Sequence, residues 1–145
     1  DYDAIVLACA GLERLGMESL ITEVLGPPRW LPAGTQGTIG IQNRSGDERV
    51  RGLIDPLRDD NAEQRTRAER AVATVLQGSC QVPLAVFAEL DNGEARIRGM
   101  VGTPDGATVL RTDHQGPVGE LDRLSGAAAD DLLRQGAAEI IAALS

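Results

Sequence analysis

Lysine is absent from this sequence, histidine occurs once, and aromatic residues make up only 2% of its 145 residues. Since lysine is absent, all 14 of the Lys and Arg residues are arginines. The chain has the length of a single domain. Because aromatic residues are scarce, its core must be built mainly from Leu, Ile, Val and Ala. The formal net charge of −8 argues against nucleic-acid binding, which requires a basic surface. Because arginine binds carboxylates in a bidentate manner, a small acidic ligand still fits this composition.

Membrane and secretion signals are equally sparse. No apolar run approaches the roughly 20 residues of a membrane-spanning helix, and the first residues have no basic segment typical of a signal peptide. Two cysteines, Cys9 and Cys80, do not form a disulfide framework, so we expect a reduced, cytoplasmic setting without membrane contact. Two distant cysteines and one histidine also give no recognisable zinc spacing, and no metal site is expected.

The first part of the chain predicts an incomplete α/β unit. The apolar run at residues 4–8 is continuous enough for a strand buried on both faces, which requires parallel neighbours. A helical turn is expected at residues 12–15 and a helix over residues 19–25. Residues 32–37 predict a flexible crossing that matches no dinucleotide-binding pattern, and a strand follows at residues 38–41. The first strand has no visible partner here, so we expect this part to belong to a larger α/β domain.

Two helices are predicted next. Asp47 caps the first, and Pro56 distorts or ends it. Asn61 caps the second, with Gln64 completing a capping box, and Gly78 is placed to be its C-terminal glycine. The apolar positions of both helices follow helical spacing: Val50, Leu53, Ile54 and Leu57 in the first, and Ala68, Ala71, Val72, Val75 and Leu76 in the second.

The rest of the chain predicts a meander followed by a helix. We expect three strands, at residues 82–90, 95–101 and 108–113. The pair Asn92-Gly93 predicts a tight hairpin turn, because both residues tolerate positive φ. Ser125 is expected to cap a helix that carries Ala129, Leu132, Leu133, Ala137, Ile140, Ile141 and Leu144 on one face. These elements predict a compact α+β unit in which helices pack on a three-stranded antiparallel sheet.

Cys80 lies in the stretch Leu76-Gln77-Gly78-Ser79-Cys80-Gln81-Val82-Pro83, between the second helix and the first strand of the meander. Most cysteines are small buried hydrophobes. Cys80 has no apolar neighbours at periodic spacing, however, and its Gly-Ser context leaves it accessible. A helix C-terminus raises the pKa of a thiol, so the position suits a covalent attachment point better than a fast-cycling nucleophile. Cys9 follows the first predicted strand and is expected in the core.

The other polar candidates have ordinary structural interpretations. His114 is expected in a polar turn and gives no support for a Cys-His or Ser-His-Asp mechanism. Arg14 follows the strand at residues 4–8, at the carboxyl end where open α/β sheets bind ligands, although a surface arginine is the commoner interpretation. An exposed, salt-bridged helix face accounts for Arg65, Arg67 and Arg70 together with Glu63 and Glu69.

The cysteine stretch resembles the cofactor-attachment motif of the porphobilinogen deaminase (hydroxymethylbilane synthase) family. Three further stretches are similar in the same order: Asp3-Ala4-Ile5-Val6-Leu7-Ala8 with Ala10-Gly11-Leu12 and Arg14-Leu15-Gly16, Leu31-Pro32-Ala33 with Gln36-Gly37, and Ala68-Glu69-Arg70-Ala71. The resemblance covers essentially the whole chain, and it implies the C-terminal portion of a member of this family.

This resemblance implies a three-domain organisation of mixed α/β and α+β class. Residues 1–33 would end the second α/β domain, and residues 34–57 would form the crossing with the strand and helix that return to the first. Residues 58–145 would form the C-terminal α+β domain, whose three-stranded antiparallel sheet packs with helices and which carries the cysteine. The first two domains of the family resemble the lobes of periplasmic binding proteins.

The function that the resemblance implies is that of a transferase in porphyrin and heme biosynthesis, part of the tetrapyrrole pathway. It condenses four porphobilinogen molecules into hydroxymethylbilane with release of ammonia. The primer is a dipyrromethane cofactor on a thioether, which would place it on Cys80. Arg14 matches a substrate-binding arginine of the family, while Gln36 and Gly37 match the crossing near the cofactor.

The sequence departs from the family at several points. Gly34-Thr35 stands where the family usually has a different residue followed by Gly, and Gln42 replaces a common acid. The family's catalytic aspartate belongs to its N-terminal half, so no catalytic residue is assigned here. The N-terminal domains are the expected partner, and we expect these 145 residues alone to be inactive. Two other classes stay open: a non-catalytic binding or regulatory domain with the third-domain fold, and a thiol redox protein, which requires a depressed Cys80 pKa.

Overall fold

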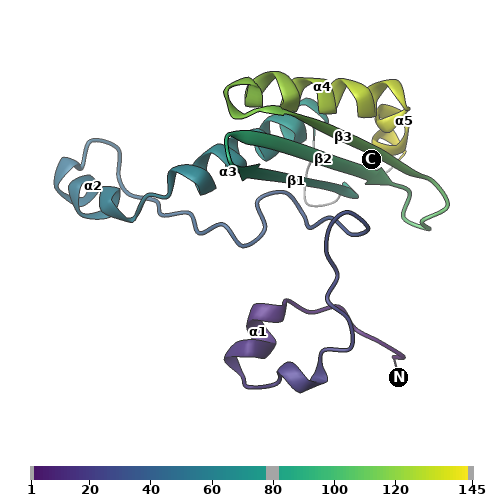
Figure 1. The fold of residues 1–145 in the computed structure, drawn as a ribbon, viewed down its shortest axis with the longest axis horizontal. Helices are drawn as coiled ribbons and strands as arrows, with labels where there is room; N and C mark the ends of the chain where they lie inside the picture. Colours follow the sequence, from purple (N-terminus) through teal and green to yellow (C-terminus); the bar gives the residue numbers. More distant parts are fainter. Residues whose placement is uncertain (1, 78–81, 144–145) are drawn as a thin grey trace. The chain divides into compact units, whose positions relative to one another are not determined.

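The computed structural model describes residues 2–77 and 82–143, and the chain divides into two compact units (Figure 1). The first unit comprises Asp1–Trp30 and the second Leu31–Ser145. Within the described ranges, no helix has the length and apolar character needed to cross a bilayer.

The first unit contains only short helices, α1 (Cys9–Arg14) and the 3₁₀ helix η1 (Glu18–Leu20). The helical turn expected at residues 12–15 therefore falls largely within α1, but the longer helix at 19–25 is reduced to η1. The strand predicted at residues 4–8 does not form, and Val6 is 81% exposed. A strand needs a neighbour for its N–H and C=O groups, and the described part of this unit has no other strand. Cys9 is half-buried instead of lying in a core.

A three-stranded antiparallel sheet forms the centre of the second unit and confirms the predicted meander. Its strands are β1 (Leu84–Asp91), β2 (Glu94–Gly102) and β3 (Val109–Pro117), in that spatial order. Asn92 and Gly93 join β1 to β2 with φ values of 50° and 82°, as a tight hairpin turn requires. β3 is longer than predicted because β2 offers partners as far as Glu94. His114, expected in a turn, is therefore a strand residue opposite Ile97.

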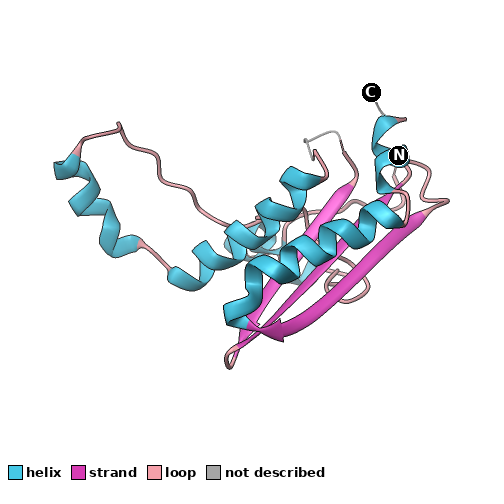
Figure 2. Cartoon of the chain, turned by 90° about the horizontal axis from the view of Figure 1, so that it is seen from above, coloured by secondary structure: helices cyan, strands magenta, loops and turns pink. Residues whose placement is uncertain are grey.

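Helices cover one face of this sheet (Figure 2). α3 (Asp60–Val75) packs on β1, and α4 (Leu121–Arg134) packs on β2, β3 and α3. The core between the two layers is aliphatic, as the shortage of aromatic residues requires, and its fully buried side chains include Val72, Val86, Ile97, Val101, Leu124 and Leu132. The single helix predicted after Ser125 is broken at Gly136, whose φ of 103° starts a separate helix, α5 (Ala137–Ala142).

Two helices, α3 and α4, start at other residues than predicted. Asp59 caps α3 through a 2.9 Å bond from the Ala62 amide, so the predicted cap Asn61 lies inside the helix. Ser125 is buried inside α4, where its hydroxyl donates to the Leu121 carbonyl at 2.9 Å. The Ser125 hydroxyl therefore bonds within the helix and caps no helix start. α4 starts one turn earlier than predicted, after Glu120, without a side-chain cap.

Residues 31–57 of the second unit are mostly irregular. They contain α2 (Glu48–Ile54) and the 3₁₀ helix η2 (Asp55–Leu57). Asp47 caps α2 by accepting a 3.0 Å bond from the Val50 amide, and the α-helix ends immediately before Asp55-Pro56, both as predicted. The strand predicted at residues 38–41 is absent, and Ile39 is 88% exposed. The three described strands pair only with one another, so these residues have no ladder to join.

Candidate cofactor site

The crossing at residues 33–38 is held against α3 and β1. The backbone amide of Thr35 donates to Oε2 of Glu69 at 2.5 Å, and the hydroxyls of Thr38 and Thr66 lie 3.3 Å apart. A Cβ on Gly34 would lie 3.9 Å from Cβ of Val86, which is ordinary van der Waals contact. The predicted crossing is therefore anchored by hydrogen bonds and close packing at its centre.

Two α3 side chains bind the outer edge of β1. Oε1 of Glu69 accepts from the Ala88 amide at 2.8 Å, and Nε of Arg65 donates to the Ala88 carbonyl at 2.7 Å. Glu69 is only 4% exposed. The guanidinium of Arg65 also lies over the Phe87 ring, 5.4 Å from its centroid. These contacts correct the prediction of an exposed, salt-bridged helix face for Arg65 and Glu69.

Gln36 and Gly37 follow Thr35 directly and line a cavity of about 750 Å³. The crossing, η2, the first half of α3 and Phe87 form its walls. Gly37 has a φ of +80°, and nothing lies within 4 Å of where a Cβ would be, so its backbone borders open space. Gln36 is exposed and lies on the same wall. The structure therefore brings these two predicted site residues together, beside an apolar and cationic surface formed by Phe87 and Arg65.

Arg14 and Cys80, the other predicted site residues, belong to other segments of the sequence. Arg14 is the last residue of α1 in the first unit, where its side chain is exposed. Cys80 and the proposed helix-ending Gly78 fall outside the described residues. The two flanks of Cys80 are described: α3 ends at Val75, and the Pro83 carbonyl accepts a 3.1 Å bond from the Gly102 amide just before β1 begins.

A second cavity, of about 380 Å³, lies between the crossing, α3 and the start of β1. Gly34, Thr35 and Arg70 line it together with Val82, which follows the undescribed stretch by one residue. Glu69 and Ala33 line both cavities. The two cavities thus share a single buried acid.

Arg98 is a buried cation that the sequence did not single out. It is 6% exposed, forms an ion pair with Glu89, and lies 5.8 Å from the Phe87 ring centroid. Its neighbour on β2, Arg96, binds both carboxylate oxygens of Asp113 at 2.8 and 2.6 Å. The bond from Arg96 holds the pKa of Asp113 below its ordinary value. In the sequence, Arg96 and Arg98 alternate with the apolar Ile97, and this alternation predicts that both arginines lie on a solvated face of the strand. The sequence therefore contains no signal that Arg98 is buried.

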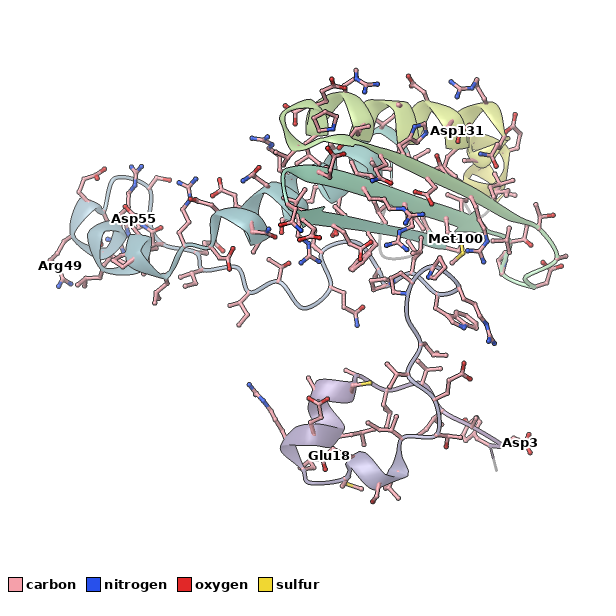
Figure 3. The ribbon with its side chains drawn as sticks, viewed as in Figure 1. Asp3, Glu18, Arg49, Asp55, Met100 and Asp131 are labelled. Carbon is pink, nitrogen blue, oxygen red and sulfur yellow. The ribbon has the colours of Figure 1, made fainter. Side chains whose placement is uncertain are left out.

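A polar cluster lies where β3 meets α4. The Thr112 hydroxyl donates to Asp131 at 2.7 Å, which lowers the pKa of that carboxyl. Figure 3 labels Asp131 on α4. His114 Nε2 lies 3.8 Å from the same carboxylate. Among the described residues, no group of three His, Cys, Asp or Glu side chains is arranged to hold a metal ion. The cluster joins the sheet to its covering helix.

Comparison with known families decides what these features belong to. Residues 1–52 match the family model "Porphobilinogen deaminase, dipyromethane cofactor binding domain", and residues 64–134 match "Porphobilinogen deaminase, C-terminal domain". The two matches follow each other along the chain and cover most of it. The chain belongs to the porphobilinogen deaminase family.

Membership defines the general chemistry of the chain. Porphobilinogen deaminases are enzymes of tetrapyrrole synthesis that act on porphobilinogen and use a dipyrromethane cofactor. The match to the cofactor-binding domain spans the crossing with Gln36 and Gly37 and also Arg14. The match to the C-terminal domain spans most of α3, the three strands and the position of Cys80. The C-terminal sheet with its covering helices agrees with the fold predicted from the sequence.

Proposed function

We propose that this chain is the portion of a porphobilinogen deaminase that carries its covalent cofactor. The complete enzyme condenses four porphobilinogen molecules into hydroxymethylbilane with release of ammonia. The single observation that carries the proposal is the consecutive match of both family domains to one chain, on either side of residues 53–63. The cofactor, when bound, supplies the pyrrole primer on which the product is built.

Cys80 is the proposed attachment point, through a thioether. Its supporting argument is the ordered frame around it: α3 ends at Val75 before the stretch, and β1 starts at Leu84 after it. A residue between two packed elements can present a bulky covalent group without opening the core. A thiol that is alkylated once needs access but no strongly lowered pKa.

Gln36 and Gly37 are the proposed non-covalent contacts of the cofactor. Both border the 750 Å³ cavity, and the free space at Gly37 lets a planar group approach its backbone closely. Phe87 and Arg65, which line the same cavity, suit a flat, carboxylate-bearing heterocycle. These properties fit the dipyrromethane group, which combines pyrrole rings with acetate and propionate side chains.

Arg14 is the proposed substrate contact. Its exposed guanidinium follows the turn of α1 and is free to bind a porphobilinogen carboxylate in a bidentate manner. Lysine offers only a point charge, so an Arg14→Lys substitution is expected to raise the KM for porphobilinogen. Turnover at saturation should change less, because this contact is made in ground state and transition state alike.

The 145 residues alone are proposed to be inactive, because no catalytic aspartate of the family is matched within them. The test is the colour reaction of protein-bound pyrrole with Ehrlich's reagent, combined with a turnover assay. We expect the intact enzyme containing this sequence to give colour and to consume porphobilinogen, and its Cys80→Ser variant to do neither. Turnover by the isolated 145 residues would contradict the proposal of inactivity.

A further inference from the structure

One buried carboxylate ties together the segments that the proposed cofactor site needs. Oε2 of Glu69 binds the amide of Thr35 on the crossing, and Oε1 binds the amide of Ala88 on β1. Both bonds are short, 2.5 and 2.8 Å, as expected for a charged acceptor. Burial at 4% exposure keeps water from competing for either amide.

The two amides that Glu69 binds belong to segments next to the proposed cofactor contacts. Thr35 immediately precedes Gln36 and Gly37 on the wall of the larger cavity. Glu69 itself lies on α3, the helix that leads to the stretch with Cys80, and Ala88 lies on β1, the strand that follows it. A single side chain therefore fixes the crossing to the two elements that flank the thiol.

Backbone geometry shows that the crossing is held against its own preference. Thr35 has a φ of 63°, a left-handed conformation that β-branched residues rarely adopt. Such a conformation persists only where the surroundings impose it, and the Glu69 bond to the Thr35 amide is a direct restraint. Without the Glu69 bond, the strained backbone at Thr35 loses one of the contacts that hold the crossing in its position.

We infer that Glu69 is a positioning residue for the cofactor, an inference that rests on the proposed function. It holds Gln36 and Gly37 at a fixed place relative to α3 and β1, the elements that precede and follow the stretch with Cys80. It does not touch the reacting atoms. Loss of its charge affects the reaction through the placement of the crossing, and displacements on the order of 1 Å cost roughly 100-fold in rate.

The experiment compares Glu69→Gln and Glu69→Ala with the wild-type intact enzyme, and Glu120→Gln serves as a matched control. Glu120 is an exposed acid in an ion pair with Arg123, distant in sequence from the crossing. Gln keeps one acceptor for one of the two amides, so it is the variant more certain to fold. Three quantities are measured: hydrogen exchange of the amides in residues 33–38, the pyrrole mass on Cys80, and kcat and KM per cofactor-loaded molecule.

We expect amide hydrogen exchange in residues 33–38 to accelerate about tenfold or more in Glu69→Gln, because the variant loses a hydrogen bond to a charged group. The kcat per loaded molecule should fall roughly 10- to 100-fold with little change in KM, because Glu69 binds no substrate. Glu120→Gln should match wild type in all three quantities. A purely structural role predicts faster exchange in Glu69→Gln with unchanged kcat per loaded molecule, and this result would overturn the inference.

The same data separate the inference from the function on which it rests. An unmodified Cys80 in the active wild-type enzyme would overturn the proposed attachment and the cofactor role of Glu69 together. A loaded wild-type Cys80 with unaltered exchange and kcat in Glu69→Gln would overturn the inference alone.

Discussion

Glu69 on α3 accepts a hydrogen bond of 2.8 Å from the amide of Ala88 on β1, an edge strand of the sheet. Arg65, one helical turn earlier, donates to the carbonyl of the same residue at 2.7 Å. Together they saturate both polar groups of Ala88 that face away from β2, as a neighbouring strand would. An exposed strand edge is prone to unwanted pairing, so these two side chains also protect β1 at this point.

Substitution of Arg65 by Met should destabilise the fold by about 1–2 kcal/mol, because the Ala88 carbonyl loses its partner and the Phe87 ring loses one of its two cation contacts. Denaturant titration measures the free energy of unfolding. Arg67→Met is the control on the same helix, since Arg67 forms only an exposed 3.4 Å ion pair with Asp122 and should change stability by less than about 0.5 kcal/mol. Equal effects at both positions would contradict the role of Arg65.

In the crossing, we expect the substitution of Thr35 by glycine to stabilise the protein. Thr35 has a φ of 63°, so Thr35→Gly should raise the melting temperature, with a gain of roughly 0.5–1 kcal/mol after the added freedom of the unfolded chain is counted. Gly37→Ala is the opposite test, because its φ of +80° penalises any side chain although the space is open. It should destabilise by about 1 kcal/mol. A destabilised Thr35→Gly variant would show that the threonine side chain outweighs the strain.

Two glycines of the C-terminal domain should respond in opposite directions to alanine. A Cβ on Gly99 would lie 3.0 Å from both Leu132 and Thr112, which are buried, so Gly99→Ala should cost about 1–3 kcal/mol. Gly126 lies within α4 with nothing near its Cβ position, and Gly126→Ala should stabilise by up to about 1 kcal/mol. Denaturation midpoints of the two variants check this, and a tolerated Gly99→Ala would contradict the packing between sheet and helix.

Acid sensitivity should depend in part on Asp113. The bonds from Arg96 lower the pKa of this carboxyl in the folded state relative to its ordinary value of 3.8. Its stabilising contribution is therefore fully present above about pH 4 and is lost as the pH falls through the lower, folded-state pKa. Asp113→Asn should reduce stability at pH 7 and narrow the difference between pH 7 and pH 3. The exposed Asp130→Asn provides the control, and an unchanged difference in Asp113→Asn would contradict the assignment.

Local patterns in the sequence predicted the C-terminal domain well. Alternation and Asn92-Gly93 predicted the hairpin of β1 and β2, and the Asp47 cap and Pro56 set the bounds of α2. These features depend on a few neighbouring residues. The start of α3 was predicted two residues late, because the capping-box pattern pointed to Asn61 whereas the Asp59 side chain caps the helix.

Long-range contacts explain what the sequence did not reveal. The apolar runs at residues 4–8 and 38–41 have strand-like composition, yet a strand forms only where a partner pairs with it, and none is described here. Glu69 looked like an exposed helix acid because its two partners are backbone amides 34 and 19 residues away, which no side-chain pattern encodes. His114 was predicted in a turn because the strand-like segment of the sequence ends at residue 113. In the structure, pairing with β2 extends β3 to Pro117.

The central claim, that Cys80 carries the dipyrromethane cofactor, is tested most directly by the mass of the intact enzyme and of its Cys80 peptide. We expect a mass increase equal to two porphobilinogen units less two ammonia molecules, located on Cys80 and absent from Cys80→Ser. Cys9→Ser should retain the addition. An active enzyme whose Cys80 peptide has its unmodified mass would contradict the claim.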